Sequence, residues 1–159
     1  LPSRALVSML IDLPALAQQC APTIAYQTVQ ALVTTESKAK PFAIGINGGA
    51  RITRQPLTKE EAVATATTLI GMGFSIDMGL GQINSANLPR LGLTVKQVFD
   101  PCTNLRAAER ILRGCYDPAA AKLGHGQAAL QAALSCYNTG NTRAGISNGY
   151  VGKVYAQSK

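Results

Sequence analysis

The spacing of apolar residues along the chain is mainly helical, and strand-like alternation is confined to one short segment. A first helix is expected from about residue 3 to 20, although Pro14 can kink or split it. A second is expected from about 23 to 37, with Pro41 just beyond its end. Further helices are expected at about 58–70, 94–97, from 104, at 126–137 and at 150–157.

Capping residues support several of these boundaries. Thr58 with Glu61, and Thr94 with Gln97, have the spacing of capping boxes. Asn104 can cap the longer helix that follows Asp100 and Pro101. These signals strengthen the prediction of a helical chain.

The segment 42–49 is rich in turn residues and alternates briefly between apolar and small residues, which predicts at most a small β-hairpin. No linker or internal repeat divides the sequence. We therefore expect one mainly α domain over residues 1–159.

The net charge of +7 favours a polyanionic partner such as a nucleic acid, a lipid surface or the bacterial wall. The basic residues are scattered singly, without the interleaved aromatic residues of nucleic-acid grooves. We expect no nucleic-acid partner.

The four cysteines, Cys20, Cys102, Cys115 and Cys136, lack the short paired spacings of a zinc site. Two disulfides in an oxidising compartment fit better than free thiols, and sequence leaves all three pairings open. The chain begins at Leu1, and its first apolar stretch is broken by Arg4 and Asp12. We expect a trimmed product of export, with neither an intact signal peptide nor a membrane span.

Glu36 is the acidic residue whose position is hardest to explain by solvation. It continues the helical stripe of Val29, Leu32 and Val33, near the carboxyl end of its helix. Burial and the negative end of the helix dipole both raise the pKa of a carboxyl group, as a general acid requires. The alternative is a glutamate that turns to water at a frayed helix end.

Three sequence blocks occur in order along the chain. They are Glu36-Ser37, the segment 78–84 (Met-Gly-Leu-Gly-Gln-Ile-Asn) and the segment 133–140 (Ala-Leu-Ser-Cys-Tyr-Asn-Thr-Gly). Together they resemble the blocks of the soluble lytic transglycosylase family, which has a lysozyme-like fold. The likeness is strongest to members that accompany type IV secretion and conjugation machines.

The resemblance implies that Glu36 is the catalytic acid and that Ser37 helps to end its helix. It further implies a substrate-binding sugar cleft formed by Ser37, Gly79, Leu80, Gln82, Asn84, Tyr137 and Asn138. Without the resemblance, Gln82 and Asn84 could simply form a turn, and Tyr137 could be a core aromatic residue. The sequence departs from the commoner family pattern at Gly45, where many relatives have Ser, and at Asn84, where many have Met.

A second carboxylate for ordinary glycosidase chemistry is hard to find. Asp77 is the acid closest to a cleft block, and its position before Met78-Gly79 is typical of a turn-forming residue. The resemblance implies a one-carboxyl reaction that yields 1,6-anhydromuramyl ends, without metal or organic cofactor. His125, between two glycines, is interpreted as a loop residue.

The expected protein is therefore a periplasmic enzyme that cleaves peptidoglycan glycan strands, with components of a type IV secretion system as further partners. Two alternatives stay open. One is a muramidase that adds water, and the other is a wall-binding scaffold protein of the secretion apparatus.

Overall fold

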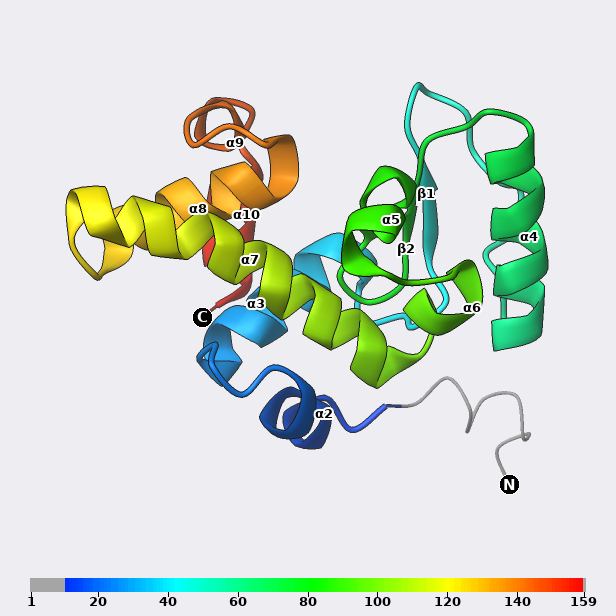
Figure 1. The fold of residues 1–159 in the computed structure, drawn as a ribbon, viewed down its shortest axis with the longest axis horizontal. Coiled ribbons are helices and arrows are strands. Elements are labelled where there is room, and N and C mark those ends of the chain that lie inside the picture. Colours follow the sequence, from blue (N-terminus) through cyan, green and yellow to red (C-terminus); the bar gives the residue numbers. More distant parts are fainter. Residues whose placement is uncertain (1–10, 159) are drawn as a thin grey trace.

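The computed structural model describes residues 11–158 and is mainly helical, as expected (Figure 1). The order of elements is α2 (Leu13–Cys20), α3 (Tyr26–Ser37), β1 (Ile44–Ile46), α4 (Lys59–Gly71), β2 (Ile76–Met78), β3 (Ile83–Asn84), a 3-10 helix η1 (Ser85–Asn87), α5 (Leu88–Leu91), α6 (Val95–Val98), α7 (Pro101–Leu123), α8 (Gln127–Thr139), α9 (Ala144–Ser147) and α10 (Tyr150–Gln157).

Helix α2 begins at Leu13 because two residues favour a start there. The Asp12 side chain accepts a hydrogen bond from the Ala15 amide, and Pro14 occupies the first turn, where no amide donor is needed. Pro14 therefore marks the start of this helix and does not kink a longer one. The earlier part of the expected helix, residues 3–10, lies outside the described residues.

The expected hairpin within residues 42–49 is wrong. Strand β1 pairs antiparallel with β2, some thirty residues later in the chain, and β2 pairs with β3. The result is a three-stranded sheet in which β2 is central. The intervening helix α4 packs against β2, so the partner of β1 is set by tertiary packing and not by a local turn.

The capping predictions are confirmed for two helices and wrong for a third. Thr58 caps α4, and Thr94 with Gln97 forms a full capping box on α6. Helix α7 begins at Pro101 with Asp100 as its cap, so Asn104 lies inside the helix. An acidic cap followed by proline is the stronger start signal of the two.

The long helix α7 crosses the middle of the molecule, with the sheet and α4 on one side and α8 to α10 on the other (Figure 1). It contributes Ala107 and Ala108 to the cluster around the sheet, Leu105 to the cluster with α2 and α3, and Leu112 to the cluster with α8 and α10. Within residues 11–158, no helix is long and apolar enough to cross a bilayer.

The four cysteines form two disulfides, Cys20–Cys102 and Cys115–Cys136. The first joins the end of α2 to the beginning of α7. The second joins the middle of α7 to α8. Of the three pairings that the sequence left open, the structure therefore contains the one that joins Cys20 to Cys102 and Cys115 to Cys136.

Candidate active site

A cleft of about 680 Å³ brings together five of the eight residues that the resemblance assigns to catalysis or sugar binding. They are Glu36, Gln82, Asn84, Tyr137 and Asn138. They come from α3, from β3 and the loop before it, and from α8. The blocks that are far apart in the chain therefore meet at one cavity.

Glu36 lies in the last turn of α3, and its stripe neighbours Val29, Leu32 and Val33 are all buried. Its Oε2 atom accepts a hydrogen bond of 2.6 Å from the hydroxyl of Tyr150 at the start of α10. Burial raises the pKa of Glu36 to about 7, the Tyr150 hydrogen bond lowers it, and the nearby charge of Asp77 raises it. A large part of the Glu36 population is therefore protonated at neutral pH.

Ser37 does not line the cleft. Its side chain is buried, and its Oγ donates to the carbonyl of Val33 within α3. The helix ends at Lys38, which has a left-handed backbone conformation and returns its amide to the carbonyls of Thr34 and Val33. Ser37 stays inside the helix, and the change of chain direction occurs one residue later.

Gly79 and Leu80 do not line the cleft either. Leu80 is completely buried beside α2 and α3. Gly79 has a φ of 75°, and a Cβ atom there would lie 2.2 Å from the Asn104 amide nitrogen. Both residues shape the loop before β3, and the structure gives neither a surface for substrate.

Gln82 reaches the cleft because the same loop holds its backbone at a φ of 51°. Its Nε2 atom donates to the carbonyls of Ala43 and Gly79, at 3.0 Å each. A Cβ atom at Gly45 would lie 2.9 Å from Gln82 Oε1. Gly45, one of the departures from the family pattern, thus leaves space for this amide.

Asn104 is a structural residue of the site that the sequence analysis missed. It is 1% exposed, and its amide accepts from the Gly81 backbone and donates to the carbonyls of Met78 and Val98. It therefore ties α7 to both ends of the cleft loop. A signal was present, because Asn104 shares a helical stripe with Ala108 and Ile111, where a polar residue needs a buried partner.

Asp77 lies in the middle of strand β2 and lines the same cleft as Glu36. The interpretation of Asp77 as a turn-forming residue is wrong, because its backbone pairs with Gly45 on one side and Asn84 on the other. Asn84 Nδ2 donates to Asp77 Oδ1 at 2.8 Å. The pKa of Asp77 is raised, because burial outweighs the lowering effect of the hydrogen bonds from Asn84 and Asn47.

Helix α8 contributes Tyr137 and Asn138 to the lining of the cleft. The Tyr137 hydroxyl donates to the Gly81 carbonyl at 2.7 Å, and burial raises its pKa well above the ordinary value. Asn138 Oδ1 accepts from Asn148 Nδ2 at 3.0 Å, which ties α8 to the loop before α10. Tyr137 is thus both a packed aromatic residue, as the alternative interpretation held, and part of the cleft wall.

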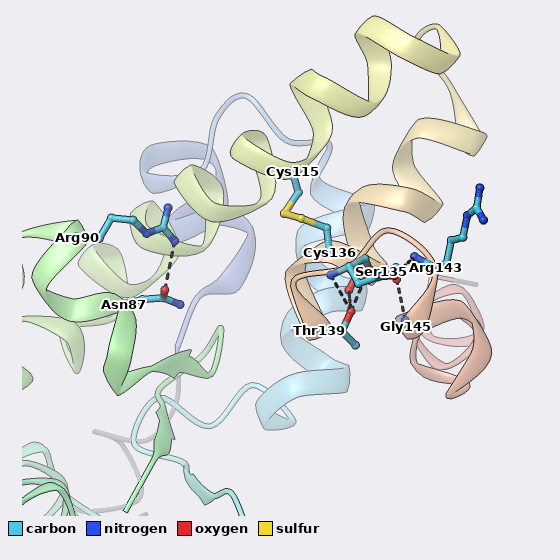
Figure 2. Close-up of a disulfide and its surroundings, with 9 residues drawn as sticks. Asn87, Arg90, Cys115, Ser135, Cys136, Thr139, Arg143 and Gly145 are labelled. Carbon is cyan, nitrogen blue, oxygen red and sulfur yellow. Dashed lines mark hydrogen bonds between the residues drawn. A yellow bond between two sulfur atoms is a disulfide. The ribbon is translucent and has the colours of Figure 1, made fainter.

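The disulfide Cys115–Cys136 lines the same cleft, and it joins α7 to α8 (Figure 2). In the same view, Arg90 and Asn87 lie on the segment across from it, joined by a hydrogen bond of 3.3 Å. Arg90 is the cationic side chain among the cleft-lining residues described by the structure.

Tyr150 was also missed, because it belongs to none of the three blocks. Its contact with Glu36 spans 114 positions of the chain, so no local spacing indicates it.

Among residues 11–158, no group of three or more His, Cys, Asp or Glu side chains is arranged to hold a metal ion.

Comparison with known proteins matches residues 14–157 to the family described as "Transglycosylase SLT domain". The type IV secretion system protein virB1 of Brucella suis biovar 1 is 47% identical over 149 residues, covering 90% of this chain and 62% of that protein. Protein virB1 of Agrobacterium tumefaciens is 38% identical over 139 residues, covering 87% and 57%. The chain thus spans less than two thirds of the length of these relatives. No solved structure matches it significantly.

Proposed function

Because the chain belongs to the transglycosylase SLT domain family, we propose that it is a peptidoglycan lytic transglycosylase with Glu36 as its acid and base. The bond cleaved is the β-1,4 linkage between N-acetylmuramic acid and N-acetylglucosamine. The observation that carries the proposal is the half-buried Glu36 carboxyl, whose pKa of about 7 lets it both give and take a proton near neutral pH.

In the proposed reaction, Glu36 donates its proton to the glycosidic oxygen as the bond from that oxygen to the anomeric carbon breaks. The N-acetyl carbonyl of the muramic acid shields the positive charge that develops on that carbon. The 6-hydroxyl oxygen of the same sugar then bonds to the anomeric carbon, and its proton returns to Glu36. Water is not consumed, and the product is a 1,6-anhydromuramyl end.

The cleft walls supply groups suited to an amino-sugar strand. Gln82, Asn84 and Asn138 present amides, which can pair with hydroxyl and N-acetyl groups. Their existing hydrogen bonds hold these amides in fixed orientations, so little side-chain entropy is lost when a sugar binds. We assign these three residues, with Tyr137, to substrate binding.

The relatives named as type IV secretion proteins suggest where such an enzyme acts. We propose that it works in the periplasm and opens the wall locally for assembly of a secretion system. The two disulfides suit an oxidising compartment, and the net charge of +7 suits an anionic wall. Secretion components are proposed as additional partners.

The decisive experiment compares the protein with its Glu36→Gln variant on purified sacculi. We expect the variant to stay folded and to lose at least about 10³-fold in cleavage rate, because the amide cannot donate a proton to the leaving oxygen. Glu60→Gln, an exposed acid in the first turn of α4, is the matched control and should remain fully active.

Mass spectrometry of the released muropeptides then separates the alternatives. Products lighter by one water support the transglycosylase, and hydrated ends would instead identify a muramidase. Undiminished cleavage by Glu36→Gln would refute the proposed acid. Wall binding with no turnover by the unmodified protein would favour the scaffold role.

A further inference from the structure

The placement of Asp77 in the sheet directs its side chain away from the core. Its neighbours in β2, Ile76 and Met78, are completely buried, so by the alternation of a strand Asp77 points to the opposite face, where it lines the cleft. Its partner on one side is Gly45, which has no side chain to cover it. The carboxylate is thus half-buried but open to the cleft.

The second partner of Asp77 holds the carboxylate in place. Asn84 Nδ2 donates to Asp77 Oδ1 at 2.8 Å and also contacts Ser75 Oγ at 3.0 Å. This hydrogen bond favours the ionised form of the carboxyl group, while burial has the larger effect and raises the pKa of Asp77. The salt bridges found within the described residues, Arg54–Glu61 and Arg113–Asp117, do not include Asp77, so no ion pair neutralises its charge there.

Glu36 and Asp77 therefore form a pair of carboxyl groups that line one cleft, one at the end of a helix and one on a strand, close enough for the charge of Asp77 to raise the pKa of Glu36. Their environments differ. Glu36 is the more deeply buried, and Asp77 is held by an amide donor. A carboxylic acid and a second carboxyl group in one cleft form the pair that glycoside cleavage uses, because positive charge develops on the sugar ring as the bond breaks.

We infer that Asp77 is a second catalytic carboxylate, which faces the sugar ring and stabilises the positive charge on the anomeric carbon while Glu36 handles the proton. Asp77 forms no covalent bond and transfers no proton in this scheme. The inference rests on the proposed function and adds to it, since the one-carboxyl reaction assigns this charge to the N-acetyl group of the substrate alone.

The test uses Asp77→Asn in the full chain, which keeps an oxygen acceptor for Asn84. Assayed on soluble peptidoglycan fragments, it should lower kcat by about 10²-fold and change KM little, because a preorganised charge acts mainly on the transition state. The alkaline limb of its pH profile should also move to lower pH, since the Asp77 charge raises the pKa of Glu36. The other titratable or charged groups at Glu36 and the cleft are Tyr150, Tyr137 and Arg90, and they are unchanged.

Two further variants keep the result decisive. Asp77→Ser should lose activity as Asp77→Asn does, whereas Asp77→Glu should retain more than either, because activity follows the charge. An Asp77→Asn enzyme with kcat within about threefold of the unmodified protein and an unshifted pH limb would overturn the inference. So would losses that follow loss of fold in thermal melts, since they would make Asp77 a purely structural partner of Asn84.

The Glu36 and Asp77 variants together separate the role of the second carboxylate from that of the acid. If Glu36→Gln abolishes cleavage and Asp77→Asn does not slow it, the second carboxylate alone is refuted. Glu60→Gln again serves as the control for loss of one negative charge outside the cleft.

Discussion

At the scale of single residues, the proton on Glu36 is controlled by opposing neighbours. Burial and the charge of Asp77 favour the protonated form, and the 2.6 Å hydrogen bond from the Tyr150 hydroxyl favours the ionised form. The balance places the pKa at about 7. Since the proposed reaction begins with a protonated Glu36, the rate should fall as pH rises through about 7.

Tyr150→Phe tests this balance. Removing the hydroxyl takes away the donor to the carboxylate, so the pKa of Glu36 should rise and the alkaline limb of the pH profile should move to higher pH. This shift is opposite in sign to the one expected for Asp77→Asn. The measurement is kcat/KM on soluble peptidoglycan fragments between about pH 5 and 9.

Tyr155→Phe is the matched control for Tyr150→Phe. Tyr155 lies on the same helix, α10, and its hydroxyl donates to Gln127 Oε1, away from the cleft. Its pH profile should equal that of the unmodified protein. An unshifted or lowered limb in Tyr150→Phe would mean that the hydroxyl does not stabilise the ionised acid.

Sequence predicted the position of Glu36 and missed its control. The stripe of Val29, Leu32 and Val33 is a local pattern, and a helix converts it directly into a buried face. The partner Tyr150 comes from the far end of the chain, and no periodicity records such a contact. The spacing of residues in the sequence therefore could not predict the contact with Tyr150, which comes from tertiary packing.

At the scale of elements, the cleft loop between β2 and β3 is positioned by a helix on its other side. Asn104 in α7 bonds the Gly81 amide and the Met78 carbonyl, and Gly79 leaves space for its side chain. The Tyr137 hydroxyl bonds the Gly81 carbonyl from α8. The loop that presents Gln82 is thus fixed from two helices.

Asn104→Ala should therefore affect both stability and catalysis. The substitution leaves the Gly81 amide and the carbonyls of Met78 and Val98 without the Asn104 side chain as a partner. Among the described residues, every buried side-chain nitrogen or oxygen atom has a hydrogen-bond partner. Each unsatisfied buried group costs about 1–3 kcal/mol, so we expect a loss of about 3 kcal/mol or more in the free energy of unfolding. Urea denaturation measures it.

Arg106→Ala, an exposed change two residues later in α7, is the control and should cost less than about 0.5 kcal/mol. Equal stability of the two variants would show that water replaces the Asn104 amide at no cost. A fall in cleavage rate with retained fold would connect the loop position to the site.

Elements with local start signals were predictable, and the sheet was not. The caps at Thr58 and Thr94 lie within four residues of what they stabilise, and both helices begin where expected. Strand β1 instead finds its partner beyond α4, so a turn-based hairpin rule selected the wrong pairing. The sequence predicts a cap at Asn104, and this prediction is wrong because the partners of Asn104 lie in β2 and the loop after it, which are distant in sequence.

At the scale of the molecule, α7 connects the sheet side to the side formed by α8 to α10, and the cleft draws lining residues from both (Figure 1). Each disulfide holds α7 to a different neighbour. Cys20–Cys102 fixes its beginning to α2, and Cys115–Cys136 fixes its middle to α8 within the cleft wall. The two bonds should therefore contribute differently to stability and to activity.

Replacing each pair by alanines separates these contributions. The closed loops differ in length, with sequence separations of 82 and 21. Chain entropy predicts losses of about 4.5 kcal/mol without Cys20–Cys102 and about 3 kcal/mol without Cys115–Cys136. Activity at low temperature, where both variants are folded, should fall mainly in the variant without Cys115–Cys136, because that disulfide lines the cleft next to Tyr137 in the sequence. Urea denaturation measures the loss of stability, and cleavage of sacculi measures the loss of activity. If activity fell more without Cys20–Cys102 than without Cys115–Cys136, the cleft would not depend on the disulfide in its wall.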